Sequence, residues 1–292
     1  MEYRHIEVHP RTVTIGADVT GVDLARLDDA TFNEVRQALH QHLVLFFHDQ
    51  DLSPEAHLAF AARFGQTEVH EVFTPLPGHP AVSVLEHDAK RPPISDSWHS
   101  DVTYREAPAL ASILYARHIP PLGGDTLWLS AYAAYEALSA PLQAVLADLH
   151  AEHDFLQAYS GYFRQQSDGN ERIRRAQQET PPVVHPVVVV HPVTAKPLLY
   201  VNPTFTSRIV ELSAKESQAV LALLFEHLLR PEFQVRFKWR VNDVAMWDNR
   251  ATQHYATGDY YPEYRRMHRV TVGGTRPVGL AAQPQMARRP AA

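Results

Sequence analysis

The string Trp98-His99-Ser100-Asp101 places an imidazole and a carboxylate two positions apart in the chain. Side chains at alternate positions of a β-strand point to the same face, so His99 and Asp101 could both reach one metal ion. A His-x-Asp triplet recurs often by chance, and alone it is more typical of a histidine hydrogen-bonded to a nearby aspartate. The metal interpretation therefore depends on further ligands elsewhere in the chain.

A second string, WDNRATQH (residues 247–254), follows an apolar strand and ends in His254. With this histidine the chain offers two imidazoles and one carboxylate. Such a facial triad leaves three positions open on an octahedral ion, which is the arrangement of non-haem Fe(II) oxygenases. Zinc enzymes commonly use three protein ligands around a tetrahedral ion, so a zinc-dependent hydrolase is the alternative from ligand types alone.

Arginines after the second string favour the oxygenase. Arg265 comes eleven residues after His254, and Arg266 and Arg269 follow it within the same five residues. Arginine presents a planar fork that grips a carboxylate through two hydrogen bonds. An oxygenase that uses 2-oxoglutarate and dioxygen needs such a fork for the distal carboxylate of 2-oxoglutarate, and a zinc hydrolase does not. The competing interpretation of any one of these arginines is a solvated charge at a strand edge.

Composition excludes several other classes of protein. The 292 residues carry a formal net charge of -6, which argues against a nucleic-acid partner. The chain contains no cysteine, so disulfides, zinc-thiolate sites and cysteine nucleophiles are excluded. No apolar run reaches the roughly 18 to 20 residues of a membrane span, and no signal peptide opens the sequence. We expect a cytoplasmic protein with no membrane partner.

Periodicity and turn signals predict many short strands and a few helices. The expected strands are residues 13–19, 43–47, 81–86, 110–117, 183–190, 198–201, 233–239, 244–247 and 266–272. The expected helices are residues 31–42 after a cap at Asp28 or Asp29, a helix from the Ser53 cap to Gly65, residues 130–149 broken by Pro141, and one from the capping box Ser213-x-x-Glu216.

This pattern favours a mainly β fold with flanking helices (α+β), either a β-sandwich or a jelly roll. A parallel α/β fold would need regular alternation of strands and helices, which the second half of the chain lacks. We expect a single domain over residues 1–292. Residues 159–182 read as a partly helical insertion or lid, residues 88–97 as a loop and residues 275–292 as a flexible tail.

Taken together, the motifs resemble the taurine dioxygenase (TauD-like) family of Fe(II)- and 2-oxoglutarate-dependent oxygenases. The resemblance rests on the two strings above and on GGDTLW (residues 123–128), two His-Pro pairs within residues 185–192, EFQVR (232–236) and RRMHR (265–269). It implies a double-stranded β-helix with an Fe(II) site at its mouth. It also implies that 2-oxoglutarate is decarboxylated to succinate, and that Thr126 joins Arg265 in holding its carboxylate.

The resemblance further implies a site for the substrate. His70 and Arg269 correspond to the pair that binds the sulfonate of taurine, and Val102 and Phe205 are implied to line the same site. A histidine and an arginine suit an anionic head group through charge-assisted hydrogen bonds.

Three positions depart from the pattern of relatives that bind taurine. Phe73 stands where those relatives carry a tyrosine, Ser95 where they carry an asparagine, and Ile94 replaces an acidic residue. The tyrosine, the asparagine and the acidic residue of those relatives would pair with the ammonium of taurine, and a buried ammonium without partners costs several kcal/mol. The departures therefore favour an anion with an uncharged tail.

The expected reaction is hydroxylation of the carbon beside the sulfonate of taurine or a related organosulfonate, with release of sulfite and an aldehyde. The alternative is the same chemistry on an alkyl sulfate ester or an aryloxy acid without an amine. The other classes are a zinc-dependent hydrolase and a non-catalytic jelly-roll binding protein. By resemblance we also expect a homo-oligomer, a dimer or a tetramer.

Overall fold

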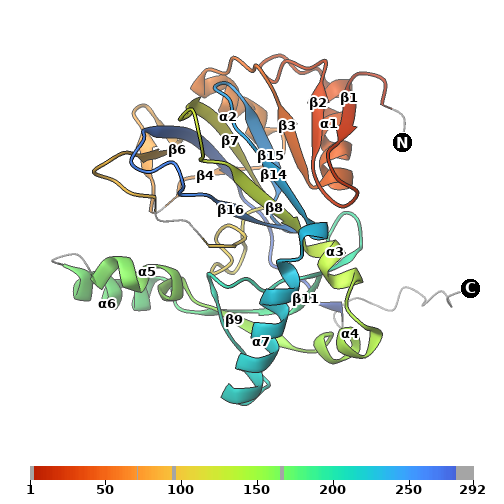
Figure 1. Cartoon of the computed structure of the whole chain (residues 1–292), viewed down its shortest axis with the longest axis vertical. Coiled ribbons are helices and arrows are strands. Elements are labelled where there is room, and N and C mark those ends of the chain that lie inside the picture. The colour runs from red at the N-terminus through yellow and green to blue at the C-terminus, as the bar shows by residue number, and fades with distance from the viewer. Residues whose placement is uncertain (1–2, 71, 94–96, 165–167, 281–292) are drawn as a thin grey trace, which may run out of the picture. The chain divides into compact units, whose positions relative to one another are not determined.

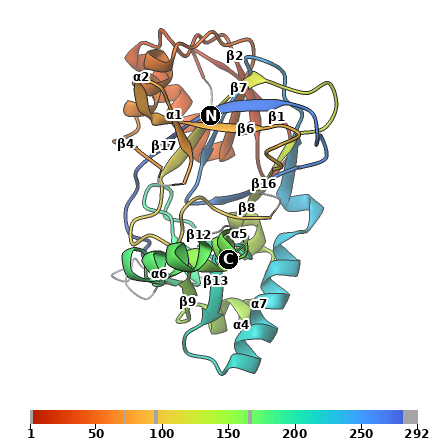
Figure 2. The ribbon, with the colours of Figure 1, turned by 90° about the vertical axis from the view of Figure 1, so that its left-hand side faces the viewer.

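Short strands outnumber helices in the computed structural model, which describes residues 3–70, 72–93, 97–164 and 168–280 (Figures 1 and 2). Ile94 and Ser95 lie outside the described residues. The chain divides into two compact units. The first comprises Met1–Val102, Ala107–Ser130 and Leu229–Thr275, and the second comprises Thr103–Glu106, Ala131–Leu228 and Arg276–Ala292. The predicted α+β class with mostly strands is confirmed.

A nine-stranded sheet is the largest element of the first unit. Its strands run in the order β1-β2-β3-β15-β7-β17-β6-β5, and β4 pairs with β17. Pairing is antiparallel except between β2 and β3, and β3, β15 and β7 run side by side in Figure 1. The bounds are β1 Glu7–Pro10, β2 Ala17–Thr20, β3 Val44–Phe47, β4 Thr67–Glu68, β5 Thr74–Leu76, β6 His79–His87, β7 Ala111–His118, β15 Val244–Asp248 and β17 Arg265–Val272.

Two helices, α1 (Asp29–His42) and α2 (Pro54–Ala62), bury their apolar sides with this sheet. Val35 of α1 and Phe60 of α2 belong to the same buried cluster as Leu45 of β3. All four residues of β3 are buried, which fits a strand covered on both faces.

A three-stranded sheet covers the other side of β3. It has the order β14-β8-β16, with β14 Gln234–Phe237 following a 3₁₀ turn at Pro231–Phe233, β8 Thr126–Ser130 and β16 Thr252–Ala256. The ring of Phe46 in β3 stacks on Phe237 with centroids 4.2 Å apart and meets Trp128 of β8 edge-on at 5.5 Å. Trp128 also packs on Trp247 of β15. An aromatic layer therefore joins two facing sheets, as in a jelly roll.

The second unit combines helices with two small antiparallel sheets, β10-β9-β13 and β11-β12. Rings of Phe155 and Phe205 pack edge-on against Tyr104 in its interior. Helices α5 and α6, which span most of the predicted lid segment, lie side by side (Figure 2). The bounds are α3 Ala131–Glu136, α4 Ala140–Leu146, β9 His150–His153, α5 Phe155–Arg164, α6 Gly169–Glu179, β10 Val183–Pro186, β11 Val188–Val190, β12 Pro197–Leu199, β13 Thr206–Ile209 and α7 Ala214–Leu228.

The predicted helix caps are largely confirmed. The side chain of Asp28 accepts a hydrogen bond from the N–H of Thr31, and Ser53 accepts one from Ala56. Ser213 and Glu216 form the expected reciprocal box at the start of α7. These residues satisfy main-chain donors that the first helical turn leaves unpaired.

Several predicted boundaries are wrong. The strand expected at residues 13–19 begins only at Ala17, because Gly16 has a φ of +86° and residues before it form a turn. The helix ending at Gly65 stops at Ala62. The helix expected at residues 130–149 is broken into two helices as predicted, but the break precedes Pro141, which lies in the first turn of the second helix, where a missing N–H costs nothing. No helix in the described part of the chain is long and apolar enough to cross a membrane.

Candidate metal centre

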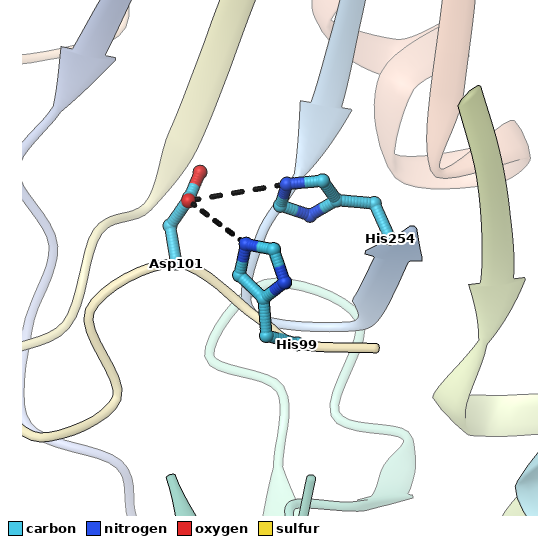
Figure 3. Close-up of side chains that lie close together, drawn as sticks. All are labelled: His99, Asp101 and His254. Carbon is cyan, nitrogen blue, oxygen red and sulfur yellow. Dashed lines mark ion pairs between the residues drawn. The ribbon is translucent and has the colours of Figure 1, made fainter. Parts of the chain in front are cut away.

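His99 and His254 lie opposite each other in an isolated antiparallel bridge. The N–H of His99 donates to the carbonyl of His254 at 3.1 Å, and the N–H of His254 donates to the carbonyl of His99 at 2.8 Å. Their ring centroids are 4.2 Å apart, and both rings face Asp101 (Figure 3). Main-chain pairing with β16 therefore fixes the separation of two residues far apart in the sequence.

Asp101 completes the cluster from a turn. Its Oδ1 lies 3.8 Å from Nε2 of His99 and 4.0 Å from Nε2 of His254. One possible ligand atom from each of the three lies within 4.8 Å of the other two, so together they could hold one metal ion. The predicted convergence of His99, Asp101 and His254 is confirmed. The expected cause, alternation of His99 and Asp101 along a strand, is wrong because Asp101 starts a turn.

The protonation states of the cluster suit metal binding. Burial lowers the pKa of His99, and burial, followed by the neighbouring His99 imidazole, lowers the pKa of His254 to about 3. Burial alone would raise the pKa of Asp101, but the Arg269 guanidinium and the two histidines hold it well below its usual range. Neutral imidazoles and an ionised carboxylate are the forms in which these side chains bind metals.

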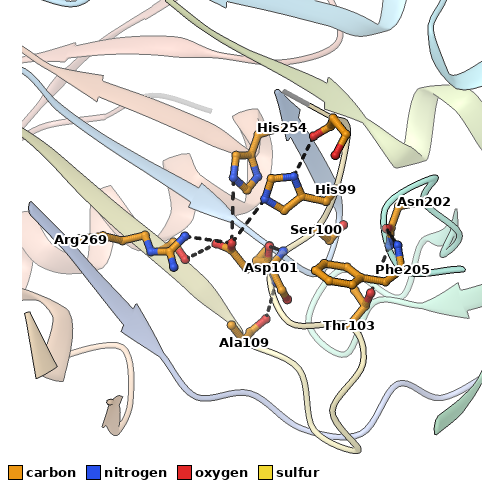
Figure 4. Close-up of polar contacts among 12 residues, drawn as sticks. His99, Ser100, Asp101, Thr103, Ala109, Asn202, Phe205, His254 and Arg269 are labelled. Carbon is orange, nitrogen blue, oxygen red and sulfur yellow. Dashed lines mark hydrogen bonds and ion pairs between the residues drawn. The ribbon is translucent and has the colours of Figure 1, made fainter. Parts of the chain in front are cut away.

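Arg269 joins the metal cluster to the predicted substrate residues. Its Nη1 donates to Oδ1 of Asp101 at 3.0 Å, and it reaches this oxygen from a different direction than the two histidines (Figure 4). Its guanidinium lies 4.6 Å from the ring centroid of Phe73, and that ring lies 4.5 Å from the ring of His70. Nε and Nη2 of Arg269 are buried without a hydrogen-bond partner among the described residues. The arrangement offers two N–H donors and a positive charge to an anion.

A second buried cation lies at Arg265. Its Nε and Nη2 also have no hydrogen-bond partner in the described part of the chain, and its guanidinium lies over the ring of Tyr260 at 5.6 Å. A Cβ on Gly124, whose φ is +72°, would lie 3.1 Å from Nε of Arg265. Trp239 donates from Nε1 to Oγ1 of Thr126 at 2.9 Å, which leaves the hydroxyl hydrogen of Thr126 for another acceptor. Unpaired buried donors of this kind fit a carboxylate such as that of 2-oxoglutarate.

The other predicted substrate residues are Val102, Phe205 and Ser95. Val102 is buried beside Asp101 in the chain and has a φ of +52°. Phe205 belongs to the second unit, where it packs on Tyr104. Ser95 lies outside the described residues.

Two residues without a predicted role hold Asp101 in place. Ser112 donates from Oγ to Oδ2 of Asp101 at 2.7 Å. Asn249 accepts from the N–H of Asp101 at 2.7 Å and donates to its carbonyl at 3.0 Å. Asn249 stands inside the string that ends in His254, so the sequence motif already pointed to this stretch of the chain. Ser112 is a single hydroxyl in an apolar strand and carried no such signal.

Two imidazoles, one carboxylate and two buried arginines between facing sheets define a candidate non-haem metal oxygenase. Residues 7–271 match the family described as "Taurine catabolism dioxygenase TauD, TfdA family". The chain belongs to this family. It has the double-stranded β-helix fold of the family, and it is an α-ketoglutarate-dependent dioxygenase of an iron-enzyme family.

Three relatives illustrate the range of the family. The chain is 38% identical to an alpha-ketoglutarate-dependent sulfate ester dioxygenase of Pseudomonas putida, over 95% of this chain and 93% of that protein. It is 35% identical to an alkylsulfatase of Acinetobacter baylyi, over 93% and 86%. The crystal structure of a taurine dioxygenase from Burkholderia xenovorans is 40% identical with a TM-score of 0.82, over 96% and 93%. The substrate of this chain is thus a small organic molecule. The names of the relatives give different classes of substrate.

Proposed function

We propose that the protein hydroxylates the carbon that bears the ester oxygen of an alkyl sulfate. In this proposal Fe(II) is held by His99, Asp101 and His254. The hydroxylated ester separates into an aldehyde and sulfate, while 2-oxoglutarate leaves as succinate and CO2. The observation that carries the proposal is the pairing of Arg269, a buried cation with two unpaired donors, with the apolar ring of Phe73.

The head group and the co-substrate would each use one arginine. Arg265 and Thr126 would hold the distal carboxylate of 2-oxoglutarate, since their unpaired donors match its two oxygens. Arg269 and His70 would bind the sulfate head. When bound, Fe(II) with 2-oxoglutarate and dioxygen supplies the oxidising power that replaces a C–H bond by C–OH. The protein orients the target carbon for this reaction by holding the anionic head group next to that carbon.

The tail of the substrate would be uncharged. Phe73 presents a ring where a hydroxyl could have met an ammonium, and the ring already lies beneath the positive charge of Arg269. Each missing hydrogen bond to a buried charged group is worth about 1.5–3 kcal/mol. Similarity to a sulfate ester dioxygenase and an alkylsulfatase supports an ester over taurine.

An organosulfonate is the second candidate, because a solved structure that is 40% identical to this chain is a taurine dioxygenase. The same site would accept a sulfonate head, and hydroxylation beside the sulfur would then release sulfite and an aldehyde. The inorganic product therefore distinguishes the two substrates.

The test is a matched panel of an alkyl sulfate, the alkylsulfonate of equal chain length, taurine and an aryloxypropionate. Succinate, aldehyde, sulfate and sulfite are measured in the same reactions. We expect equal amounts of succinate, aldehyde and sulfate from the alkyl sulfate, with taurine disfavoured in kcat/KM by about ten-fold or more. A clear preference for taurine would overturn the proposal, and a preference for the alkylsulfonate with sulfite release would establish the second candidate.

A further inference from the structure

The two carboxylate oxygens of Asp101 have different neighbours. Oδ1 faces Nε2 of both His99 and His254. Oδ2 accepts a hydrogen bond of 2.7 Å from Oγ of Ser112. A hydroxyl has one hydrogen to donate, and here it goes to the oxygen that is not in the cluster.

Ser112 is held rigidly where it makes this bond. It lies inside β7, it is fully buried, and it pairs with Trp247 on one side and Thr271 on the other. Asn249 is also fully buried and binds the main chain of Asp101 through both its N–H and its carbonyl. The side chain of Asp101 is thus fixed by Ser112 in β7, and its main chain is fixed by Asn249, which directly follows β15.

We propose that Ser112 is a positioning residue that keeps Asp101 a one-oxygen ligand of the metal. The inference rests on the proposed iron site. A carboxylate can bind a metal through one oxygen or through both. The short, charge-assisted bond from Ser112 holds Oδ2 toward β7. Turning this oxygen toward a bound metal would require the bond to break, whereas Oδ1 accepts from Nη1 of Arg269 and still faces both histidines.

The coordination count explains why this matters. An octahedral ion held by three protein atoms would keep three positions open. The keto acid of 2-oxoglutarate would need two of them and dioxygen the third, so a second oxygen from Asp101 would compete with dioxygen. By holding Oδ2 away from the ion, Ser112 would preserve access of dioxygen and contribute little to metal affinity.

Nitric oxide, which binds Fe(II) at an open position, tests this directly. Anaerobic protein with Fe(II) and 2-oxoglutarate is titrated with nitric oxide, followed by electron paramagnetic resonance, and Fe(II) affinity is measured separately. For Ser112→Ala we expect nitric oxide affinity and kcat/KM for dioxygen to fall by about ten-fold or more. Fe(II) affinity should stay within a few-fold. Ser112→Cys, whose thiol is a weaker donor of similar shape, should fall between the two proteins.

Ser217→Ala is the matched control, because Ser217 is buried and hydrogen-bonded to the N–H of Ile209 but touches no candidate ligand. Unchanged nitric oxide affinity in Ser112→Ala with normal Fe(II) binding would overturn the inference and leave the proposed iron site intact. A fall in Fe(II) affinity with unchanged nitric oxide affinity would also overturn it. Failure of the unmodified protein to bind Fe(II) would instead remove the iron site itself.

Discussion

Nη1 of Arg269 lies 3.0 Å from Oδ1 of Asp101, the same oxygen that faces both histidines of the candidate metal cluster. The arginine also keeps two unpaired buried donors and packs on Phe73. One guanidinium therefore touches the carboxylate of the cluster and offers its remaining donors to an anion. A bound substrate anion and the metal would share one neighbouring cation.

Removal of a cluster ligand is expected to abolish both Fe(II) retention and succinate formation. Asp101→Ala and His254→Ala each delete one of only three protein ligands, so the ion loses a third of its protein contacts. Bound iron is measured after desalting, and circular dichroism checks the fold. His9→Ala alters an exposed histidine and should behave like the unmodified protein. Full turnover in either ligand variant would remove that residue from the assignment.

Arg265 is expected to act on the co-substrate and not on the metal. Arg265→Ala should weaken 2-oxoglutarate binding by about 2–5 kcal/mol, because truncation removes the charged partner of a buried carboxylate. The readouts are the KM for 2-oxoglutarate and the Fe(II) affinity without co-substrate. Arg266, its neighbour on the other face of β17, provides the matched variant Arg266→Ala, with a small expected effect. Loss of iron with a normal KM would contradict the assignment.

Polar groups restored at the tail end of the substrate site should improve taurine. Phe73→Tyr combined with Ser95→Asn adds a hydroxyl and an amide that can accept hydrogen bonds from an ammonium. The tyrosine ring keeps the contact with the Arg269 guanidinium. We expect kcat/KM for taurine relative to the alkyl sulfate to rise by about ten-fold. An unchanged ratio would show that these positions do not select the tail.

His57 should make the protein less stable in acid. Burial lowers its pKa from 6.5 to about 3, and its Nε2 lies 3.2 Å from the carbonyl of Ile113. Below a pH of about 6.5 His57 is protonated in the unfolded chain but stays neutral in the folded chain. The folded state therefore loses stability as pH falls from about 6.5 toward 3. The loss from this group alone is about 2 kcal/mol between pH 7 and pH 5.

Denaturant unfolding of His57→Leu at the same two pH values checks this effect. The variant should show a smaller difference in the free energy of unfolding, by about the same 2 kcal/mol. His9→Ala again serves as the control, since His9 is exposed. An identical pH dependence in the unmodified protein and in His57→Leu would contradict the prediction.

Local signals in the sequence predicted the cluster residues better than the strands that carry them. His99, Asp101, His254 and Arg265 stand in short strings whose residue types already indicate metal and carboxylate binding. The strands β8 and β16 were not predicted. Thr126–Ser130 runs directly into a helix, and Thr252–Ala256 mixes polar and apolar residues without alternation. Their pairing with each other fixes them as strands, and such tertiary effects override local preference.

The supporting hydrogen bonds were beyond local prediction for a related reason. Ser112 reaches Asp101 only because β7 passes beside the turn that carries the carboxylate. Trp239 reaches Thr126 across more than a hundred residues of sequence. Neither contact leaves a periodic or short-range pattern, so only the folded chain reveals it.

The most direct measurement of the central claim is an anaerobic optical titration of the protein with Fe(II) and 2-oxoglutarate. Chelation of the keto acid should produce a visible charge-transfer band, which is absent from Asp101→Ala and needs more 2-oxoglutarate in Arg265→Ala. Addition of an alkyl sulfate should perturb the band, and taurine at the same concentration should not. Absence of the band in the unmodified protein, or a band that responds to taurine and ignores the alkyl sulfate, would contradict the account.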